Sequence, residues 1–281
     1  MFDEFFPDNP DKRESLFHGA AVCDRVINIG SDKSDNLVKK LLEEKTFEEI
    51  YTSSGKCKER TVKRIARQLE SIPFEFKLIK HTDEDFPEGL KREKCAPAIY
   101  TRGDINLLKK KSFAVVGTRK RITEDDRLLG KLLTLILSEK YVIVSGLAYT
   151  CDTIAHEAAI QKGKTIAVLA KPLNKPYPSE NEALHETIGR DHLLVSQFPF
   201  GIKTYGSHFV SRDLTQACLA TEGVVILHAP DNSGTKHASK HAFNQGKPIY
   251  ALPSNFRQNY NWITKFNAKT VEELLNETSS D

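Results

Sequence analysis

The sequence lacks any apolar run long enough to cross a membrane, since no hydrophobic stretch approaches about 18 uninterrupted residues. Its first residues, MFDEFFPDNPDKRE, are acidic and interrupted by prolines, without the basic and apolar segments of a secretory signal. These absences favour the cytoplasm and give no indication of a membrane partner.

Cysteine is scarce and scattered. The five cysteines form no CxxC pair and stand at positions 23, 57, 95, 151 and 218. This spacing predicts neither a disulfide framework nor a cysteine-based zinc site. His237 and His241 have a spacing that can bind a metal, but no HExxH motif and no adjacent acidic ligand accompanies them, so we expect no metal.

Two nucleotide-binding signatures are also missing. The sequence contains no GxxxxGK[ST] loop, and its strand-end glycines are not part of a GxGxxG fingerprint. A Walker-type phosphate loop is therefore excluded, and a nicotinamide or flavin dehydrogenase is disfavoured. We predict no cofactor.

What the sequence does have is an ordinary globular composition, with 39% hydrophobic and 28% charged residues. Its 281 residues suffice for one large domain and one small one. The net charge of +3 is weak evidence for a polyanionic partner, because total charge says little about where the charges lie.

Residues 1–75 are predicted to form a small helical N-terminal domain. Two amphipathic stretches, 35–44 and 60–69, place their apolar residues on one helical stripe. The second stretch carries Lys63, Arg64 and Arg67 on its polar face. A solvated basic face is the simpler interpretation, and a nucleic-acid contact is the alternative.

From residue 76 the pattern alternates between strands and helices. Continuous apolar runs predict strands at 113–117, 141–145, 165–169, 192–198, 223–228 and 248–252. Helical patterns lie between them at 124–139, 152–162, 179–189, 209–221 and 233–245. This alternation predicts an α/β fold, a Rossmann-like doubly wound and mostly parallel sheet, over residues 76–276, with a frayed tail at 277–281.

Ligands of such sheets bind outside the carboxyl ends of the strands. Small and basic residues follow several of these ends, so we predict a phosphate-binding crevice there. The candidate residues are Gly117, Thr118, Arg119, Lys120, Ser145, Gly146, Leu147, Arg212, Ser233, Gly234, Thr235 and Lys236.

Asp152 and His156 stand one helical turn apart just behind Gly146. They can be read as a general acid–base pair, or as structural residues, with Asp152 accepting hydrogen bonds from the helix N-terminus. We favour the structural interpretation. No nucleophile with a neighbouring base is evident, and Cys151 is expected to be packed, so no catalytic residue is predicted.

Several motifs occur in a fixed order: FAVVGTRK, YVIVSGLAYTCDTIAHEAAIQKGKTIAVLA, YPSEN and a C-terminal QGKPIYALPSN. In this order they resemble the DNA-processing protein A family, also called Smf, over about residues 80–276. The resemblance implies an extended Rossmann domain behind a small helical domain. It also implies proteins that bind single-stranded DNA, dimerise, and help load the RecA recombinase in natural transformation and recombination, without acting as enzymes. Asp152, His156 and His237 would support the phosphate-binding rim.

The sequence departs from the family pattern at several positions. Thr150 stands where a glycine is usual, and His228 stands where an acidic residue is usual. Asp213 and Leu214 replace the asparagine and second arginine of the F-P-x-R-N-R motif, which should weaken phosphate binding there. The chain shows no winged-helix segment after the core, as in some members.

Three functional hypotheses remain open at this stage. The first is a single-stranded DNA-binding recombination mediator, with Tyr149, Phe198 and Phe200 as candidate base-stacking residues. The second is a sensor of a nucleotide-derived ligand, or a nucleoside-monophosphate N-glycosidase, on the same fold. The third is a scaffold that only dimerises.

Overall fold

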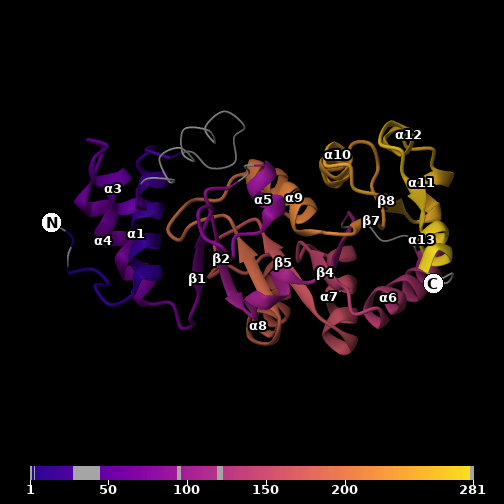
Figure 1. Ribbon diagram of the computed structural model, residues 1–281, viewed down its shortest axis with the longest axis horizontal. Coiled ribbons are helices and arrows are strands. Elements are labelled where there is room, and N and C mark those ends of the chain that lie inside the picture. Colours follow the sequence, from indigo (N-terminus) through magenta and orange to yellow (C-terminus); the bar gives the residue numbers. More distant parts are fainter. Residues whose placement is uncertain (1, 3, 28–44, 94–95, 119–122, 279–281) are drawn as a thin grey trace. The chain divides into compact units, whose positions relative to one another are not determined.

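The computed structural model describes residues 2, 4–27, 45–93, 96–118 and 123–278. Across this part of the chain the strands form one sheet in the order β1-β2-β6-β5-β4-β3-β7-β8-β9. The strands are β1 Lys77–Lys80, β2 Ala98–Gly103, β3 Ser112–Val116, β4 Val142–Ser145, β5 Thr165–Leu169, β6 Leu193–Ser196, β7 Gly223–Ile226, β8 Ile249–Ala251 and β9 Lys269–Thr270. Figure 1 shows their arrangement with the helices.

The chain divides into two compact units. The first unit holds residues 1–102, 169–175 and 195–211, and the second holds residues 103–168, 176–194 and 212–281. The division of the chain at residue 75 that the sequence suggests stays a prediction.

The first unit contains three packed helices, α1 Pro10–Cys23, α3 Phe47–Thr52 and α4 Glu59–Glu70. The start of α1 is fixed by Asn9, whose side chain accepts a hydrogen bond from the Lys12 N–H, and by a proline in the first turn. Thr46 and Glu49 form a reciprocal capping box at α3. Local sequence therefore sets both helix starts.

Aromatic rings fill the centre of this unit. His18 of α1 stacks on Phe47 at 4.1 Å between ring centroids, and its Nδ1 lies 2.8 Å from the hydroxyl of Tyr100 on β2. Phe200 packs edge-on against Tyr100. Burial lowers the pKa of His18 to about 3, so the ring is neutral and belongs to the core.

The second unit carries the parallel part of the sheet. Strand β3 pairs in parallel with β4 and with β7, and the parallel pairing continues from β4 to β5 and from β7 to β8 and β9. Its helices are α6 Asp126–Ser138, α7 Cys151–Lys162, α8 Glu182–Asp191, α10 Lys236–Asn244, α11 Pro253–Arg257, α12 Asn261–Lys265 and α13 Val271–Thr278. Helix α9 Gly206–Leu219 begins in the first unit and ends in the second.

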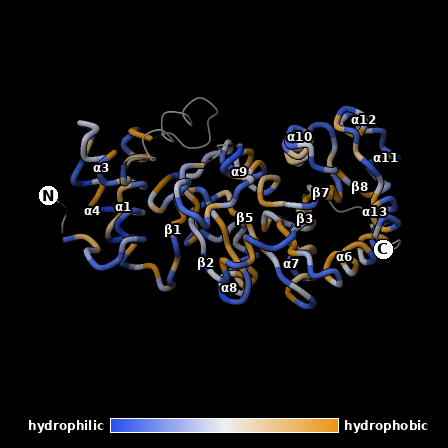
Figure 2. Tube along the Cα trace, viewed as in Figure 1, coloured by the Kyte–Doolittle hydropathy of each residue, from blue (hydrophilic) through white to orange (hydrophobic). Residues whose placement is uncertain are grey.

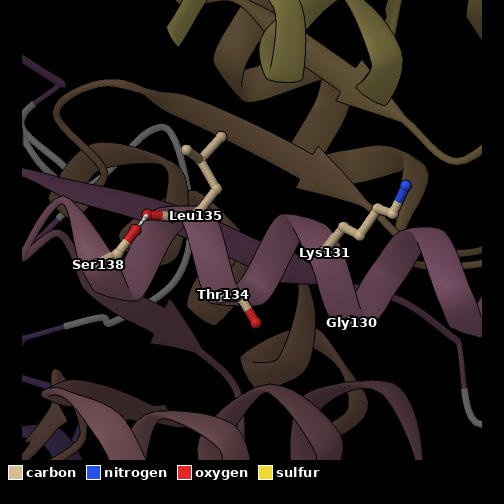
Figure 3. Close-up of a pocket in the computed structure, with 5 residues that line it drawn as sticks. All are labelled: Gly130, Lys131, Thr134, Leu135 and Ser138. Carbon is tan, nitrogen blue, oxygen red and sulfur yellow. Dashed lines mark hydrogen bonds between the residues drawn. The ribbon is translucent and has the colours of Figure 1, made fainter. Parts of the chain in front are cut away.

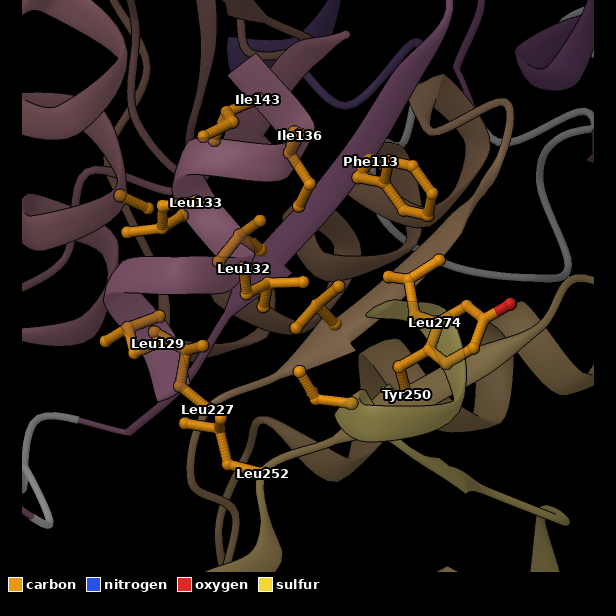
Figure 4. Close-up of a cluster of buried hydrophobic side chains, with 14 of the residues drawn as sticks. Phe113, Leu129, Leu132, Leu133, Ile136, Ile143, Leu227, Tyr250, Leu252 and Leu274 are labelled. Atoms are coloured by element: carbon orange, nitrogen blue, oxygen red, sulfur yellow. The ribbon is translucent and has the colours of Figure 1, made fainter. Parts of the chain in front are cut away.

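One hydrophobic cluster joins α6, α7 and α13 to the sheet (Figure 4). Leu132 and Ile136 of α6 are almost fully buried against residues such as Phe113 of β3 and Tyr250 of β8. Hydrophobic residues are concentrated in the strands and along α6 (Figure 2). Helix α10 packs on β7 and β8 and lies away from this cluster, so helices cover both faces of the sheet (Figure 1).

The predicted fold class is confirmed. Every strand and helix predicted between residues 113 and 252 is present, with ends shifted by at most three residues. The predicted helix at 60–69 is α4, whereas the predicted helix at 35–44 lies outside the described residues.

The sequence patterns did not predict helix α1 or strands β1 and β2. Ser15 and His18 are buried in α1 together with its apolar residues, so the helix has no polar stripe to reveal its period. The short α5 Glu88–Glu93 and the 3₁₀ helices η1 Ile105–Lys109, η2 Thr123–Asp125 and η3 Ser179–Asn181 complete the described elements. No helix among the described residues is long and apolar enough to span a bilayer.

The packing of α6 gives a stability prediction. Leu132→Ala removes a fully buried side chain from the cluster and should lower the free energy of unfolding by about 2–5 kcal/mol. Leu135→Ala is the matched control, because Leu135 lies on the outer face of the same helix, beside a shallow depression lined by Gly130, Lys131, Thr134 and Ser138 (Figure 3). Urea unfolding measures both. Equal losses of stability in the two variants would contradict the assignment of the buried and outer faces of α6.

Candidate phosphate-binding edge of the parallel sheet

The strand order of the second unit reverses between β3 and β7. Since β3 has β4 on one side and β7 on the other, the loops that follow β4, β3 and β7 are neighbours along the carboxyl edge of the sheet. This is the place where open α/β sheets bind their ligands. The described residues of the three predicted loop groups, 117–118, 145–147 and 233–236, lie on this edge.

A backbone hydrogen bond joins the loops after β3 and β7, and the Asn255 side chain holds the second loop. The Thr118 N–H donates to the His228 carbonyl at 2.9 Å, and the side-chain oxygen of Asn255 accepts from the Ala229 N–H at 3.0 Å. The amide of Asn255 also donates to the Leu227 carbonyl. This part of the edge is thereby fixed before any ligand arrives.

Neighbouring side chains leave no room for a Cβ atom at Gly117 or Gly146. A Cβ atom at Gly117 would lie 2.6 Å from the Cβ and the Sγ of Cys151, at the start of α7. A Cβ atom at Gly146 would overlap a guanidinium nitrogen of Arg212. Neighbouring side chains thus already require glycine at these two positions, whereas Gly234 faces open space, and the predicted approach of a ligand to the three glycines stays a prediction.

The turn after β4 has an unusual backbone. Leu147 and Thr150 have φ values of 60° and 66°, in the left-handed region that non-glycine residues rarely adopt. The Asp152 carboxylate accepts hydrogen bonds from the N–H groups of Gly146 and Ala148, both at 3.2 Å. From the other side, the Asn181 amide donates to the Leu147 carbonyl at 3.0 Å. The turn is held in a strained shape by buried side chains.

Asp152 makes structural hydrogen bonds, but with different partners from those expected. Its carboxylate accepts from the turn that precedes α7 and not from the helix N-terminus.

His156 is also structural. It is completely buried, and burial lowers its pKa to about 3, so its ring is neutral. The Thr165 hydroxyl donates its proton to the Ile143 carbonyl, so its oxygen accepts from Nδ1 of His156 at 2.8 Å. The ring joins α7 to the sheet, and the acid–base interpretation loses its support.

Arg212 lies inside the protein, with 8% of its surface exposed. Its Nη1 donates to the carbonyl of Gly146 and, at 3.2 Å, to that of Val168, while its Nε donates to Asp213 at 3.0 Å. These bonds give Arg212 a supporting position behind the rim. The phosphate contact predicted for it stays a prediction.

Two carboxylates lie near this one guanidinium: the Asp152 side chain is buried, and the Asp213 side chain is 15% exposed. Burial raises the pKa of Asp213 to about 6; Arg212 opposes that rise, and the neighbouring Asp152 adds to it. Burial likewise raises the pKa of Asp152, against the pull of Arg212. The cluster therefore carries more negative than positive charge whenever both carboxylates are ionised.

Other predicted residues divide by exposure. The Ser145 hydroxyl is buried and donates to the Val115 carbonyl at 2.6 Å, and Leu147 is buried, so neither side chain is open to a ligand. Thr118, Ser233, Thr235 and Lys236 are half-buried, and Gly234 is exposed. Arg119 and Lys120 lie outside the described residues.

The loop after β7 is anchored by its own contacts. Asp231 accepts hydrogen bonds from Asn261 and from the Trp262 N–H of α12, and Lys236 donates its ammonium to the Asp231 carbonyl oxygen. His237, predicted as a supporting residue, is half-buried, and burial, Lys236 and Lys240 all lower its pKa. It therefore offers hydrogen bonds and not positive charge at neutral pH.

Phe198 and Phe200 were wrongly proposed as stacking residues, because both are completely buried. The most exposed rings among the described residues are others: Tyr205 is 61% exposed and Phe243 is 48% exposed. No sequence signal separates these two pairs, since exposure is set by tertiary packing. Among the described residues, no group of three or more potential metal ligands comes together.

Comparison with known proteins decides the family. The model of the family described as DNA recombination-mediator protein A matches residues 77–278. The chain belongs to this family.

Curated relatives agree with the family assignment, and solved structures agree with the fold. DNA processing protein DprA of Streptococcus pneumoniae is 35% identical over 175 residues, which are 62% of this chain and 61% of that protein, so the match spans less than two thirds of the relative. The crystal structure of the S. pneumoniae protein superposes with a TM-score of 0.71 and 24% identity, over 95% of this chain and 97% of that one. DNA processing protein A from Helicobacter pylori superposes with a TM-score of 0.63 and 24% identity, over 74% of this chain and 98% of the other.

The structure shows the surroundings of two residues that depart from the family pattern. Thr150, where the family usually has glycine, is one of the two left-handed residues of the strained turn. Asp213, where the family usually has asparagine, is one of the two carboxylates beside Arg212. Thr150 thus adds backbone strain, and Asp213 adds negative charge, to the residues that support the loop after β4.

Thr150→Gly is expected to raise the free energy of unfolding by about 0.5–2 kcal/mol, because relief of left-handed strain exceeds the entropy that glycine adds to the unfolded chain. Thermal unfolding measures the effect. Thr134→Gly, on the exposed face of α6, is the control and should lower stability by a few tenths to 1 kcal/mol. Destabilisation by Thr150→Gly would show that the turn tolerates threonine without strain.

Asp213→Asn should change the pH dependence of stability. The pKa of Asp213 is raised in the folded protein, so the folded state binds its proton more tightly, and wild type gains stability as the pH falls from 7.5 towards 5. The asparagine variant lacks this gain. Melting temperatures at pH 5, 6 and 7.5 test it, with Glu139→Gln, an exposed carboxylate after α6, as control. Parallel profiles for wild type and Asp213→Asn would refute the assignment of a raised pKa to Asp213.

Proposed function

We propose that this protein binds single-stranded DNA through phosphate contacts at the carboxyl edge of the parallel sheet. The observation that carries the proposal is the strained turn after β4, which the Asp152, Arg212 and Asn181 side chains hold from inside. Backbone strain of this kind persists where surrounding structure over-determines it, and it is concentrated at functional sites.

The contacts themselves come from the neighbouring loops. Backbone N–H groups at the start of α10 and the ammonium of Lys236 would face phosphate oxygens, together with Thr118 and, from the sequence, Arg119 and Lys120. Such contacts tolerate any base sequence and weaken with salt.

The family supports this ligand. The H. pylori neighbour has been studied for its unique single-stranded DNA binding mode. On the same resemblance, the protein acts in the cytoplasm as a homodimer and assists RecA loading during transformation and recombination. A helical domain over 1–75 precedes the DNA-binding domain over 76–276, and no catalytic step is proposed.

Fluorescence anisotropy with a labelled single strand of about 30 nucleotides tests the proposal at low and high salt. We expect steep salt dependence, and at least a several-fold loss of affinity in the double variant Arg119→Ala, Lys236→Ala. The slope of log K against log salt should fall by about 0.7 for each phosphate-binding cation that the variant removes. The control is Lys111→Ala, an exposed lysine just before β3, at the opposite edge of the sheet.

Absence of binding by wild type at low salt would refute the DNA-binding proposal. Tight binding of a single nucleoside monophosphate in its place would support the nucleotide-ligand hypothesis. Equal losses of affinity in the double variant and in Lys111→Ala would show that the binding site does not lie at this edge. A RecA filament-assembly assay on coated single strands tests the partner separately.

A further inference from the structure

The first unit has a strongly basic surface of its own on α4. Arg60, Lys63, Arg64 and Arg67 stand at helical spacings of three and four residues and are all exposed. The opposite face of the helix is buried, with Val62, Ile65 and Leu69 in the core. The four cations therefore form one continuous stripe along the outer face of α4.

Among the described residues, few acidic groups pair with this stripe. Lys63 pairs with Glu59 one turn earlier, at an exposed position where such a pair contributes little. Arg60 and Arg67 form no ion pair within the part of the chain that the structure describes. Lys56 and Lys58 precede the helix, and of these Lys58 pairs with Asp24, the residue that follows α1. The surface has a clear excess of positive charge.

Arg64 joins the stripe to a second segment of the same unit, residues 201–205. Its Nη1 donates to the Gly201 carbonyl at 3.0 Å, and Gly201 lies directly against Ile65 of α4. Lys175 donates to the Ile202 carbonyl at 3.4 Å, and Lys203 is exposed. The segment thus carries one exposed cation, Lys203, and Lys175 of the same unit contacts it.

The same segment carries Tyr205, the most exposed of the large hydrophobic side chains among the described residues, at 61%. Its ring meets His208 edge-on at 5.6 Å between centroids, and His208 stacks on the buried Phe198 at 4.3 Å. The tyrosine is therefore exposed and also held in place. Tyr205 follows Gly201, which Arg64 of α4 contacts, by four residues in the chain. Cations together with an exposed aromatic ring are the combination that binds single-stranded nucleic acid, with phosphates on the cations and a base on the ring.

We propose that α4 and the segment 201–205 form a second contact surface for single-stranded DNA, separate from the carboxyl edge of the parallel sheet. This inference rests on the proposed function, because it gives the same ligand a further contact. Arg60, Lys63 and Arg67 bind phosphates, Arg64 fixes the segment to the helix, and Tyr205 stacks on a base.

The test measures binding of a labelled strand of about 40 nucleotides, and of a duplex of the same length, across a salt series. Arg60→Ala, Lys63→Ala and Arg67→Ala are combined, and Arg64 is kept because it anchors Gly201. We expect the affinity for the single strand to fall about tenfold. The slope of log K against log salt should fall by about 2, because three phosphate contacts are lost. The control combines Lys109→Ala, Lys110→Ala and Lys111→Ala, which remove the same charge from exposed positions before β3.

Tyr205 supplies a second, uncharged test. Tyr205→Ala should weaken single-strand binding by about fivefold or more without changing the salt slope, whereas Tyr205→Phe should bind like wild type. Neither variant should change duplex binding.

The outcomes separate the two proposals. If wild type binds and the sheet-edge double variant is impaired, but the α4 triple variant matches its lysine control, the second surface is refuted and the proposed function stands. Equal losses for duplex and single strand, with no effect at Tyr205, also refute it. If wild type binds no single strand at all, the proposed function itself fails.

Discussion

The candidate site depends on one buried guanidinium. Arg212 donates hydrogen bonds to the carbonyls of Gly146 and Val168, at the ends of two adjacent strands, and to Asp213 on its own helix. Removal of one partner from such a buried charged network leaves another charge uncompensated, which typically costs about 3–5 kcal/mol. The position of α9 and the shape of the turn after β4 are thus set by the same interaction.

This arrangement separates the residues that shape the rim from those that can touch a ligand. Asp152, His156 and Arg212 make their hydrogen bonds inside the protein, where burial also shifts the pKa of both Asp152 and His156. Thr118 and the 233–236 loop remain open to solvent in part. A rigid turn held by a buried network suits a phosphate chain, because it requires no rearrangement when the ligand binds.

Charge is distributed unevenly, which the total of +3 conceals. In the first unit the cations of α4 stand on one exposed face, while the first turn of α3 carries Glu48 and Glu49. In the second unit the positive groups at the sheet edge are few, and the carboxylates beside Arg212 are largely buried. A polyanion would therefore be bound by local surfaces and not by the field of the whole molecule.

The sequence by itself determined the alternation of strands and helices from residue 113 onward, because continuous apolar runs and amphipathic periods are local properties of the chain. It also placed the glycine-rich turns at the strand ends, and the order of the motifs indicated the family. Tertiary structure alone decided which candidate residues are accessible. Arg212 and Phe200 look like surface ligand contacts in sequence but are buried, and Tyr205 gave no signal but is exposed. Burial is a sum over contacts between residues far apart in the chain, so no local pattern can report it.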